Sequence, residues 1–311
     1  MEGVTDYPMR ALLSETGAFS FCVSEFLRVS HEVPPPHVFF RHLPELKQNS
    51  RTPSGVPVQC QLLGGDHGRL AESAARAVSL GAGGIDLNFG CPAPTVNRHD
   101  GGATLLKFPL RLRDIVEAVR KAVPSHIPVS AKLRLGWEDC SPIHENSDRA
   151  AEGGASWITI HARTRAQGYA PPVDWNSIGL VRKRLSIPVV ANGDIWSLDD
   201  FKRCREVTGS THFMIGRGAL ANPGLAVAIA CEMGAQVNQD FVSDSASASA
   251  WIPLLKRFSF WCEGFFYGPE YVPRRMKQWL KMAHLRGTIS WFDQIKRCQT
   301  EADFFKALAA I

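Results

Sequence analysis

The 311-residue sequence has no run of about 18 apolar residues, so no transmembrane helix is expected. It does not open on a charged stretch followed by an apolar segment, so no secretory signal is expected. Its eight cysteines are scattered singly and none forms a C-x-x-C pair, which argues against a zinc site and a redox dithiol. These absences predict a cytoplasmic protein with reduced thiols, no bound metal and no membrane association.

Positive charge is distributed unevenly along the chain. The formal net charge is +5, and residues 250–311 contain ten Lys or Arg against five Asp or Glu. The rest of the chain is balanced, with 25 residues of each sign. An excess confined to one segment indicates a polyanion partner there, and an ordinary solvated helical surface is the alternative interpretation.

Short apolar, β-prone runs recur with helix-length spacers between them, which predicts parallel strands joined by crossover helices. Seven such runs are visible, and residues 1–4 read as the loop that follows a further strand. The predicted fold is therefore an α/β, TIM-type (β/α)8 barrel whose first strand is missing or shortened. The seven runs are 19–26, 56–63, 84–90, 128–136, 157–163, 188–194 and 212–219.

The pattern changes near residue 240. Residues 243–250 (SDSASASA) have the composition of a flexible linker, and aromatic-rich helical stretches follow them. We therefore predict a barrel domain over residues 1–240 and a small helical bundle over residues 241–311.

Catalytic groups of such barrels lie at the carboxyl ends of the strands, and phosphate commonly binds after the last two. The segments Asn192-Gly193-Asp194 and Gly216-Arg217 follow those strands, and both predict a phosphate site. Two ordinary strand-to-helix turns would also be rich in glycine, which leaves that alternative open.

Polar groups also occupy other predicted strands. Lys132 interrupts a buried strand, where its ammonium must reach either an anionic ligand or a carboxylate. Gln61 and His161 come at the ends of two further predicted strands, on the same side of the barrel as Lys132. For His161, a structural role is the alternative to a ligand contact.

The most specific element runs from Asp86 through Asn88 to Cys91-Pro92, just after a predicted strand. A cysteine thiol has an unperturbed pKa of about 8.5, so near neutrality Cys91 is mostly protonated and can act as an acid. A buried inert cysteine and a thiolate nucleophile are the two alternatives.

Taken together, these motifs resemble the tRNA dihydrouridine synthases, in family order and over roughly residues 1–225. The matching segments are 1–6 (MEGVTD), 61–64 (QLLG), 88–92 (NFGCP), 132–134 (KLR), 161–164 (HART) with 167–169 (QGY), 192–194 (NGD) and 216–218 (GRG). The helical segment at the end of the chain also matches the layout of the family.

The resemblance implies FMN in the barrel mouth, reduced by NADPH. The residues expected to bind FMN are Met1, Glu2, Gln61, Lys132, His161, Asn192, Gly193, Asp194, Gly216 and Arg217. The flavin would pass hydride to C6 of a flipped-out uracil while Cys91 protonates C5 and Asn88 helps to hold the base.

The resemblance also implies tRNA as the substrate of a monomeric enzyme. Residues 24–29, 95–97, 101–103 and 277–280 resemble the branch that reduces uridine 16 of the D-loop. The residues expected to contact the RNA, besides Asn88, are Arg28, Tyr169, Arg274, Arg275 and Lys277. Two other functions are weighed against this one. They are an FMN barrel acting on a free pyrimidine, as in dihydroorotate dehydrogenases, and an RNA-binding protein that has lost catalysis.

Overall fold

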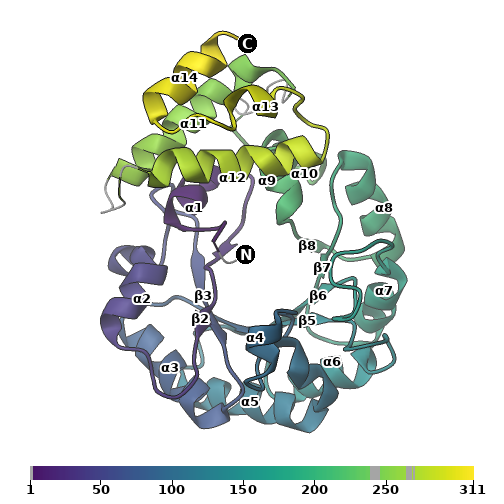
Figure 1. Cartoon of the computed structure of the whole chain (residues 1–311). Helices are drawn as coiled ribbons and strands as arrows, with labels where there is room; N and C mark the ends of the chain where they lie inside the picture. Colours follow the sequence, from purple (N-terminus) through teal and green to yellow (C-terminus); the bar gives the residue numbers. More distant parts are fainter. Residues whose placement is uncertain (1–2, 239–245, 264–267, 269) are drawn as a thin grey trace.

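The computed structural model describes residues 3–238, 246–263, 268 and 270–311. Parallel strands form one curved sheet with helices along its outer side, and further helices gather at one end of the molecule (Figure 1). The predicted α/β barrel architecture is therefore confirmed. The strands are β1 (Cys22–Val23), β2 (Leu27–Arg28), β3 (Val58–Leu63), β4 (Ile85–Asn88), β5 (Val129–Arg134), β6 (Trp157–His161), β7 (Val189–Asn192) and β8 (His212–Met214).

The sheet is open in the described residues. Its order is β1-β3-β4-β5-β6-β7-β8, β2 also pairs with β3, and no strand precedes α1 between Gly3 and Asp6. Strands β1 and β2 share one position beside β3, with Val23 opposite Gln59 and Leu27 opposite Leu62. One extra residue is therefore accommodated between them, which divides the strand predicted over 19–26 in two and moves its second half beyond residue 26.

The helices follow the strands as crossover connections require. Helix α3 begins as its sequence predicts, because the Asp66 carboxylate accepts a hydrogen bond from the Arg69 backbone N–H. The helices of the barrel are α1 (Tyr7–Ser14), α2 (Pro36–His42), α3 (His67–Ser79), α4 (Pro94–Asn97), α5 (Pro109–Ala122), α6 (Ile143–Glu152), α7 (Trp175–Arg184), α8 (Leu198–Thr208), α9 (Arg217–Ala221) and α10 (Gly224–Glu232), with 3-10 helices η1 (Pro44–Gln48) and η2 (Gly102–Lys107).

Side chains alternate between the two faces of each strand. In β5, the apolar residues Val129, Ala131 and Leu133 join the core beneath the outer helices. Ser130 and Lys132 instead form hydrogen bonds to side chains of β4 and β7, which lie across the inner face. The inside of the barrel is therefore polar at these positions, and its apolar core lies between the sheet and the helices.

The C-terminal part is helical, as predicted. Its helices are α11 (Ala248–Glu263), α12 (Tyr271–Leu285), α13 (Phe292–Ile295) and α14 (Glu301–Ala309). They share a second core with α1 and α9, in which Trp251, Phe258 and Trp279 are buried beside Met9 and Leu220. The predicted boundary at residue 240 lies outside the described residues and stays a prediction. No helix in the described ranges is long and apolar enough to cross a bilayer.

Candidate active site

Cys91 lies three residues after the end of β4 and is partly exposed. Its backbone N–H and that of Gly90 both donate to Asn88 Oδ1, each over 3.0 Å. Its carbonyl oxygen accepts a hydrogen bond from the Ala103 N–H over 3.1 Å. A Cβ atom on Gly102 would lie only 2.8 Å from that carbonyl oxygen, so the loop closes only with glycine there. The backbone of Cys91 is therefore fixed on both sides.

A chain of side-chain hydrogen bonds fixes the orientation of Asn88. Backbone N–H groups can only donate, so Asn88 must present its oxygen to the Cys91 loop and its amino group to Gln61 Oε1, 2.9 Å away. The amino group of Gln61 then faces Asp86 Oδ2 over 2.7 Å, and Ser130 Oγ donates to Asp86 Oδ1 over 2.5 Å. Asp86 therefore acts only as an acceptor, and it fixes the orientation of both amides.

Lys132 continues this polar face on β5. Its Nζ donates to Asn192 Oδ1 over 3.0 Å, and the amino group of Asn192 donates to the Met214 carbonyl over 2.7 Å. Burial lowers the pKa of Lys132 to about 8, although the nearby charge of Asp86 opposes that shift. The side chain is therefore a cation at neutral pH that a ligand can readily perturb.

His161 stands at the end of β6, opposite Asn192 on β7. Burial, with a smaller effect from the charges of Lys132 and Arg134, lowers the pKa of its imidazole to about 2. The ring is therefore neutral at any working pH. Its Nδ1 atom is buried and has no hydrogen-bond partner among the described residues, which indicates a site for a polar ligand.

The two predicted phosphate segments meet after β7 and β8. Arg217 Nη2 lies 3.3 Å from Asp194 Oδ1, and the buried Arg163 forms a bidentate pair with the same carboxylate. Burial raises the pKa of Asp194, but the hydrogen bonds and charge of Arg163 outweigh it and lower the pKa overall. Gly193 has φ +124°, which favours glycine. Two guanidinium groups share one carboxylate here, which leaves one net positive charge for an anionic ligand.

Aromatic rings and guanidinium groups alternate around Arg217. The guanidinium of Arg217 lies 4.5 Å from the ring centre of Tyr169 and 5.0 Å from that of Trp196. The guanidinium of Arg286, the C-cap residue of α12, lies 3.4 Å from the ring centre of Trp196. Tyr169 is 57% exposed and its ring meets His161 edge-on at 6.3 Å. These contacts connect the C-terminal helices to the barrel mouth.

The three basic residues predicted together on α12 do not share one environment. Arg274 is exposed, whereas Arg275 is buried and its Nε lies 2.8 Å from Asp6 Oδ2. The ammonium of Lys277 donates to the Cys298 carbonyl over 2.7 Å. This geometry opposes an RNA contact by Arg275, which instead holds α12 against the segment before α1.

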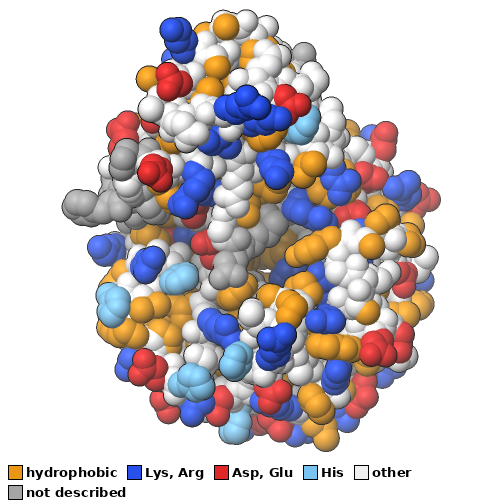
Figure 2. Space-filling view, viewed as in Figure 1, with side chains coloured by type: hydrophobic (Ala, Val, Ile, Leu, Met, Phe, Trp, Pro, Cys, Tyr) orange, Lys and Arg blue, Asp and Glu red, His pale blue; other side chains and the backbone are white. Residues whose placement is uncertain are grey.

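The remaining predicted residues lie elsewhere. Arg28 is exposed, and its guanidinium donates to the Thr95 carbonyl over 3.0 Å, beside the loop that carries Cys91. Gly216 caps the start of α9. Met1 and Glu2 lie outside the described residues. Figure 2 shows a hollow at the centre of the face drawn in Figure 1, with Lys and Arg side chains gathered around it.

Sequence reasoning assigned no role to Asp86, Ser130, Arg134 and Arg163. A signal was available, because Ser130, Lys132 and Arg134 alternate with apolar residues along one strand. Arg134 donates to the carbonyl oxygens of Gly90, Thr164 and Gly168, and so links the Cys91 loop to the loop that carries Tyr169. No group of His, Cys, Asp or Glu side chains in the described ranges is arranged to hold a metal ion.

This chain is similar to known proteins over most of its length. The family model described as dihydrouridine synthase matches residues 1–256. A tRNA-dihydrouridine(16) synthase of Shewanella oneidensis is 45% identical over 281 residues, which cover 90% of this chain and 85% of that protein. One of Vibrio cholerae, with the same name, is 46% identical over 290 residues, covering 92% of this chain and 85% of that protein.

Two solved structures share the barrel fold. Histamine dehydrogenase from Rhizobium sp. 4-9 superposes with a TM-score of 0.55 at 14% identity, over 82% of this chain and 47% of that one. The old yellow enzyme homologue from Zymomonas mobilis gives a TM-score of 0.52 at 13% identity, over 80% of this chain and 87% of that one. These likenesses bear on the fold alone, whereas the family match and the 45–46% identical relatives establish the kinship: the chain belongs to the dihydrouridine synthase family.

Proposed function

We propose that this protein reduces uridine 16 in the D-loop of tRNA to 5,6-dihydrouridine, the activity that names its relatives. The observation that carries the proposal is the joint position of Cys91 and the polar face of the barrel. Cys91 is fixed at the end of β4, while Lys132 and the unpartnered Nδ1 of His161 lie on the two strands that follow in the sheet. A proton donor thus borders a site suited to a polar, anionic cofactor.

The residues of this site fit FMN. The buried imidazole nitrogen of His161 lacks a partner, and Lys132 supplies a cation. Gly193 and Arg217 supply a close backbone approach and charge for a phosphate. Gln61, Asn192, Asp194 and Gly216 would complete the site, and Met1 and Glu2 stay predicted contributors. Bound FMN, re-reduced by NADPH, would supply the hydride that C6 of uracil receives.

Cys91 would donate the proton that C5 receives. Chemistry on an RNA base requires the base to leave its stack and enter a pocket, and the barrel mouth provides one. The side-chain oxygen of Asn88 accepts two hydrogen bonds, and one N–H of its amino group donates to Gln61. The second N–H of the amino group would therefore donate to a uracil oxygen. Asn88 would thus fix the loop of the acid and the position of the base together.

The orientation of the tRNA must select uridine 16, because neighbouring uridines present the same base edges. Phosphate contacts set such an orientation. Arg28, Tyr169, Arg274 and Lys277 are the residues we propose for it, with Arg275 acting through the placement of α12. A cytoplasmic location and a monomeric state stay predictions.

The direct test is to express the chain in a bacterial strain that lacks dihydrouridine at position 16, and to map the modification in its tRNA. We expect dihydrouridine to return at position 16 alone. Its appearance at position 17 or 20, with 16 left unmodified, would contradict the assigned position. Unmodified tRNA together with reduction of free pyrimidines would favour a small-molecule reductase, and tRNA binding without any reduction would favour a protein that has lost catalysis.

Removing the side chain of Asn88 should disturb the acid more than the cofactor. Asn88→Ala leaves the N–H groups of Gly90 and Cys91 without their acceptor, at a cost of about 1–3 kcal/mol each when buried. We expect uridine reduction to fall about 10- to 100-fold while flavin reduction by NADPH is unchanged. Alkylation of Cys91, followed by peptide mass spectrometry, should be faster in the variant. Equal alkylation rates would show that the Cys91 loop does not depend on Asn88.

The two neighbouring arginines of α12 should have separable effects. Arg275→Ala breaks a buried ion pair with Asp6, so we expect the free energy of unfolding to fall by about 3–5 kcal/mol. Arg274→Ala should leave the free energy of unfolding unchanged. It should make the plot of log tRNA affinity against log salt shallower by about one. Denaturant titration and binding across a salt series measure the two effects. Loss of stability in the Arg274 variant alone would reverse the assignment.

A further inference from the structure

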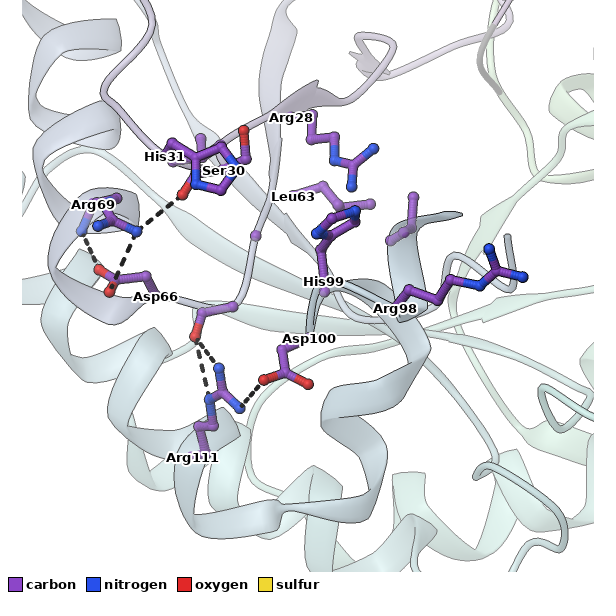
Figure 3. A pocket seen from close by; sticks show the side chains of 15 residues that line it. Arg28, Ser30, His31, Leu63, Asp66, Arg69, Arg98, His99, Asp100 and Arg111 are labelled. Carbon is purple, nitrogen blue, oxygen red and sulfur yellow. Dashed lines mark hydrogen bonds and ion pairs between the residues drawn. The ribbon is translucent and has the colours of Figure 1, made fainter. Parts of the chain in front are cut away.

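A cavity lies at the carboxyl ends of β2 and β3, beside the loop that follows β4. It has a volume of about 360 Å³, and its fifteen lining residues come from the ends of β2 and β3, from the loops around them and after β4, and from helices α3, α4 and α5. Four of its lining residues are arginines, Arg28, Arg69, Arg98 and Arg111, and Figure 3 shows the Arg98 side chain extended away from the other labelled side chains. Its size is at the lower end of the range for small-ligand pockets, about 300–1,000 Å³, and is ample for one sugar–phosphate unit.

The cavity carries excess positive charge. Arg69 pairs with Asp66 over 3.9 Å, and Arg111 pairs with Asp100 over 3.4 Å, so these four charges balance. Arg28 and Arg98 form no ion pair with any residue that the structure describes. Two positive charges therefore remain, and both side chains are exposed to an incoming anion.

The lining also indicates which part of a nucleic acid would bind. None of the fifteen residues is Phe, Tyr or Trp, so the aromatic rings of the lining are the two imidazoles of His31 and His99, against four guanidinium groups. Its donors are guanidinium groups, which match phosphate oxygens in geometry and charge. Such a site would contact the sugar–phosphate backbone of a nucleic acid and would not distinguish one base from another.

The cavity shares a wall with the loop of the catalytic cysteine. Val96 and Gly101 line it, and both belong to the segment whose ends join through the Cys91 carbonyl and the Ala103 N–H. Arg28 binds the same segment through the Thr95 carbonyl. Cys91 and the cavity therefore border the same segment, residues 91–103.

We propose that this cavity binds a sugar–phosphate unit of the RNA strand next to the uridine held in the barrel mouth. The proposal rests on the proposed function, since it needs tRNA as the substrate. Contacts to a flanking phosphate set the register of the strand, so the cavity would help to bring one uridine of the loop, and not its neighbour, to Cys91.

The test neutralises Arg98, whose guanidinium forms no hydrogen bond with any residue that the structure describes, so the substitution breaks no internal contact of that group. Arg98→Gln should make the plot of log affinity for unmodified tRNA against log salt shallower by about one. The KM of this variant for tRNA should rise while kcat stays unchanged. In the double variant Arg28→Gln/Arg98→Gln, the plot of log affinity against log salt should become shallower by about two. Arg182→Gln is the matched control, because Arg182 is an exposed arginine on α7 outside the cavity.

Three further outcomes are decisive. An unchanged slope in a variant that still forms dihydrouridine would overturn the cavity proposal and leave the proposed function intact. A raised KM for NADPH in flavin reduction without tRNA would overturn it too, because the cavity would then bind a dinucleotide phosphate. Wild-type protein that neither binds nor modifies tRNA would instead overturn the proposed function.

Discussion

Replacing Cys91 by alanine is expected to lower the rate of uridine reduction by about 10²–10⁴-fold, the usual contribution of a general acid. Flavin content and the rate of flavin reduction by NADPH should stay close to those of the wild-type enzyme. The reason is geometric: the Cys91 N–H donates to the Asn88 side-chain oxygen and the Cys91 carbonyl accepts from the Ala103 N–H, so neither contact involves the thiol and its removal leaves the loop in place. Single-turnover measurements of the two half-reactions would separate the effects.

The control for this variant is Cys231→Ala, which removes an exposed cysteine on α10 and should change neither half-reaction. An equal loss of flavin reduction in Cys91→Ala would indicate that the thiol supports the flavin site structurally. Full activity in that variant would require another proton donor, and neutral His161 is a poor candidate because the pKa of its imidazole is lowered to about 2.

The strands could be predicted well where an apolar run was bounded by turn residues. The runs containing β3 to β7 each include their strand with a few residues to spare. The last run, predicted over 212–219, was too long, because its sequence stays apolar while the chain leaves β8 at Met214 and starts α9 at Arg217. Hydrophobicity alone does not separate a strand from the buried helix that follows it.

The candidate site was predictable in part because its residues lie on the predicted strands. Gln61 and Lys132 lie within β3 and β5, and His161 and Asn192 end β6 and β7, all in one sheet. The partners of those residues could not be predicted, because pairing depends on register. Asp86 and Ser130 meet only because β4 and β5 align these two residues.

The basic segment of α12 shows a different limit. Arg274 and Arg275 are adjacent in sequence, but a helix turns about 100° per residue, so one faces solvent and the other faces α1. Charge counting predicted a common role for them, and only the ion pair with Asp6 separates the two.

Removing the charge of Lys132 should have the second large effect, on cofactor retention. Lys132→Gln keeps an N–H donor for Asn192 Oδ1, so the variant isolates the charge from the hydrogen bond. Truncating one member of a buried charged contact costs about 2–5 kcal/mol, which is about 30-fold to several thousand-fold in affinity. We expect the variant to purify largely without flavin, while circular dichroism shows an unchanged fold. A fully flavin-loaded, active variant would refute the role of Lys132.

The same residue gives the wild-type protein a pH dependence whose sign follows from its pKa. With a pKa of about 8, Lys132 is a cation below pH 8 and loses its proton as the pH rises through that value. Affinity of the flavin-free protein for FMN should therefore be steady from pH 6 to 7.5 and fall above about 8. Asp86→Asn is a second variant, judged by the pH at which the fall begins and not by the affinity itself, because the charge of Asp86 raises the pKa of Lys132 and its carboxylate also orients Gln61. In that variant the fall should begin at lower pH, whereas in Lys132→Gln it should disappear. A fall that survives in Lys132→Gln would place the titrating group elsewhere.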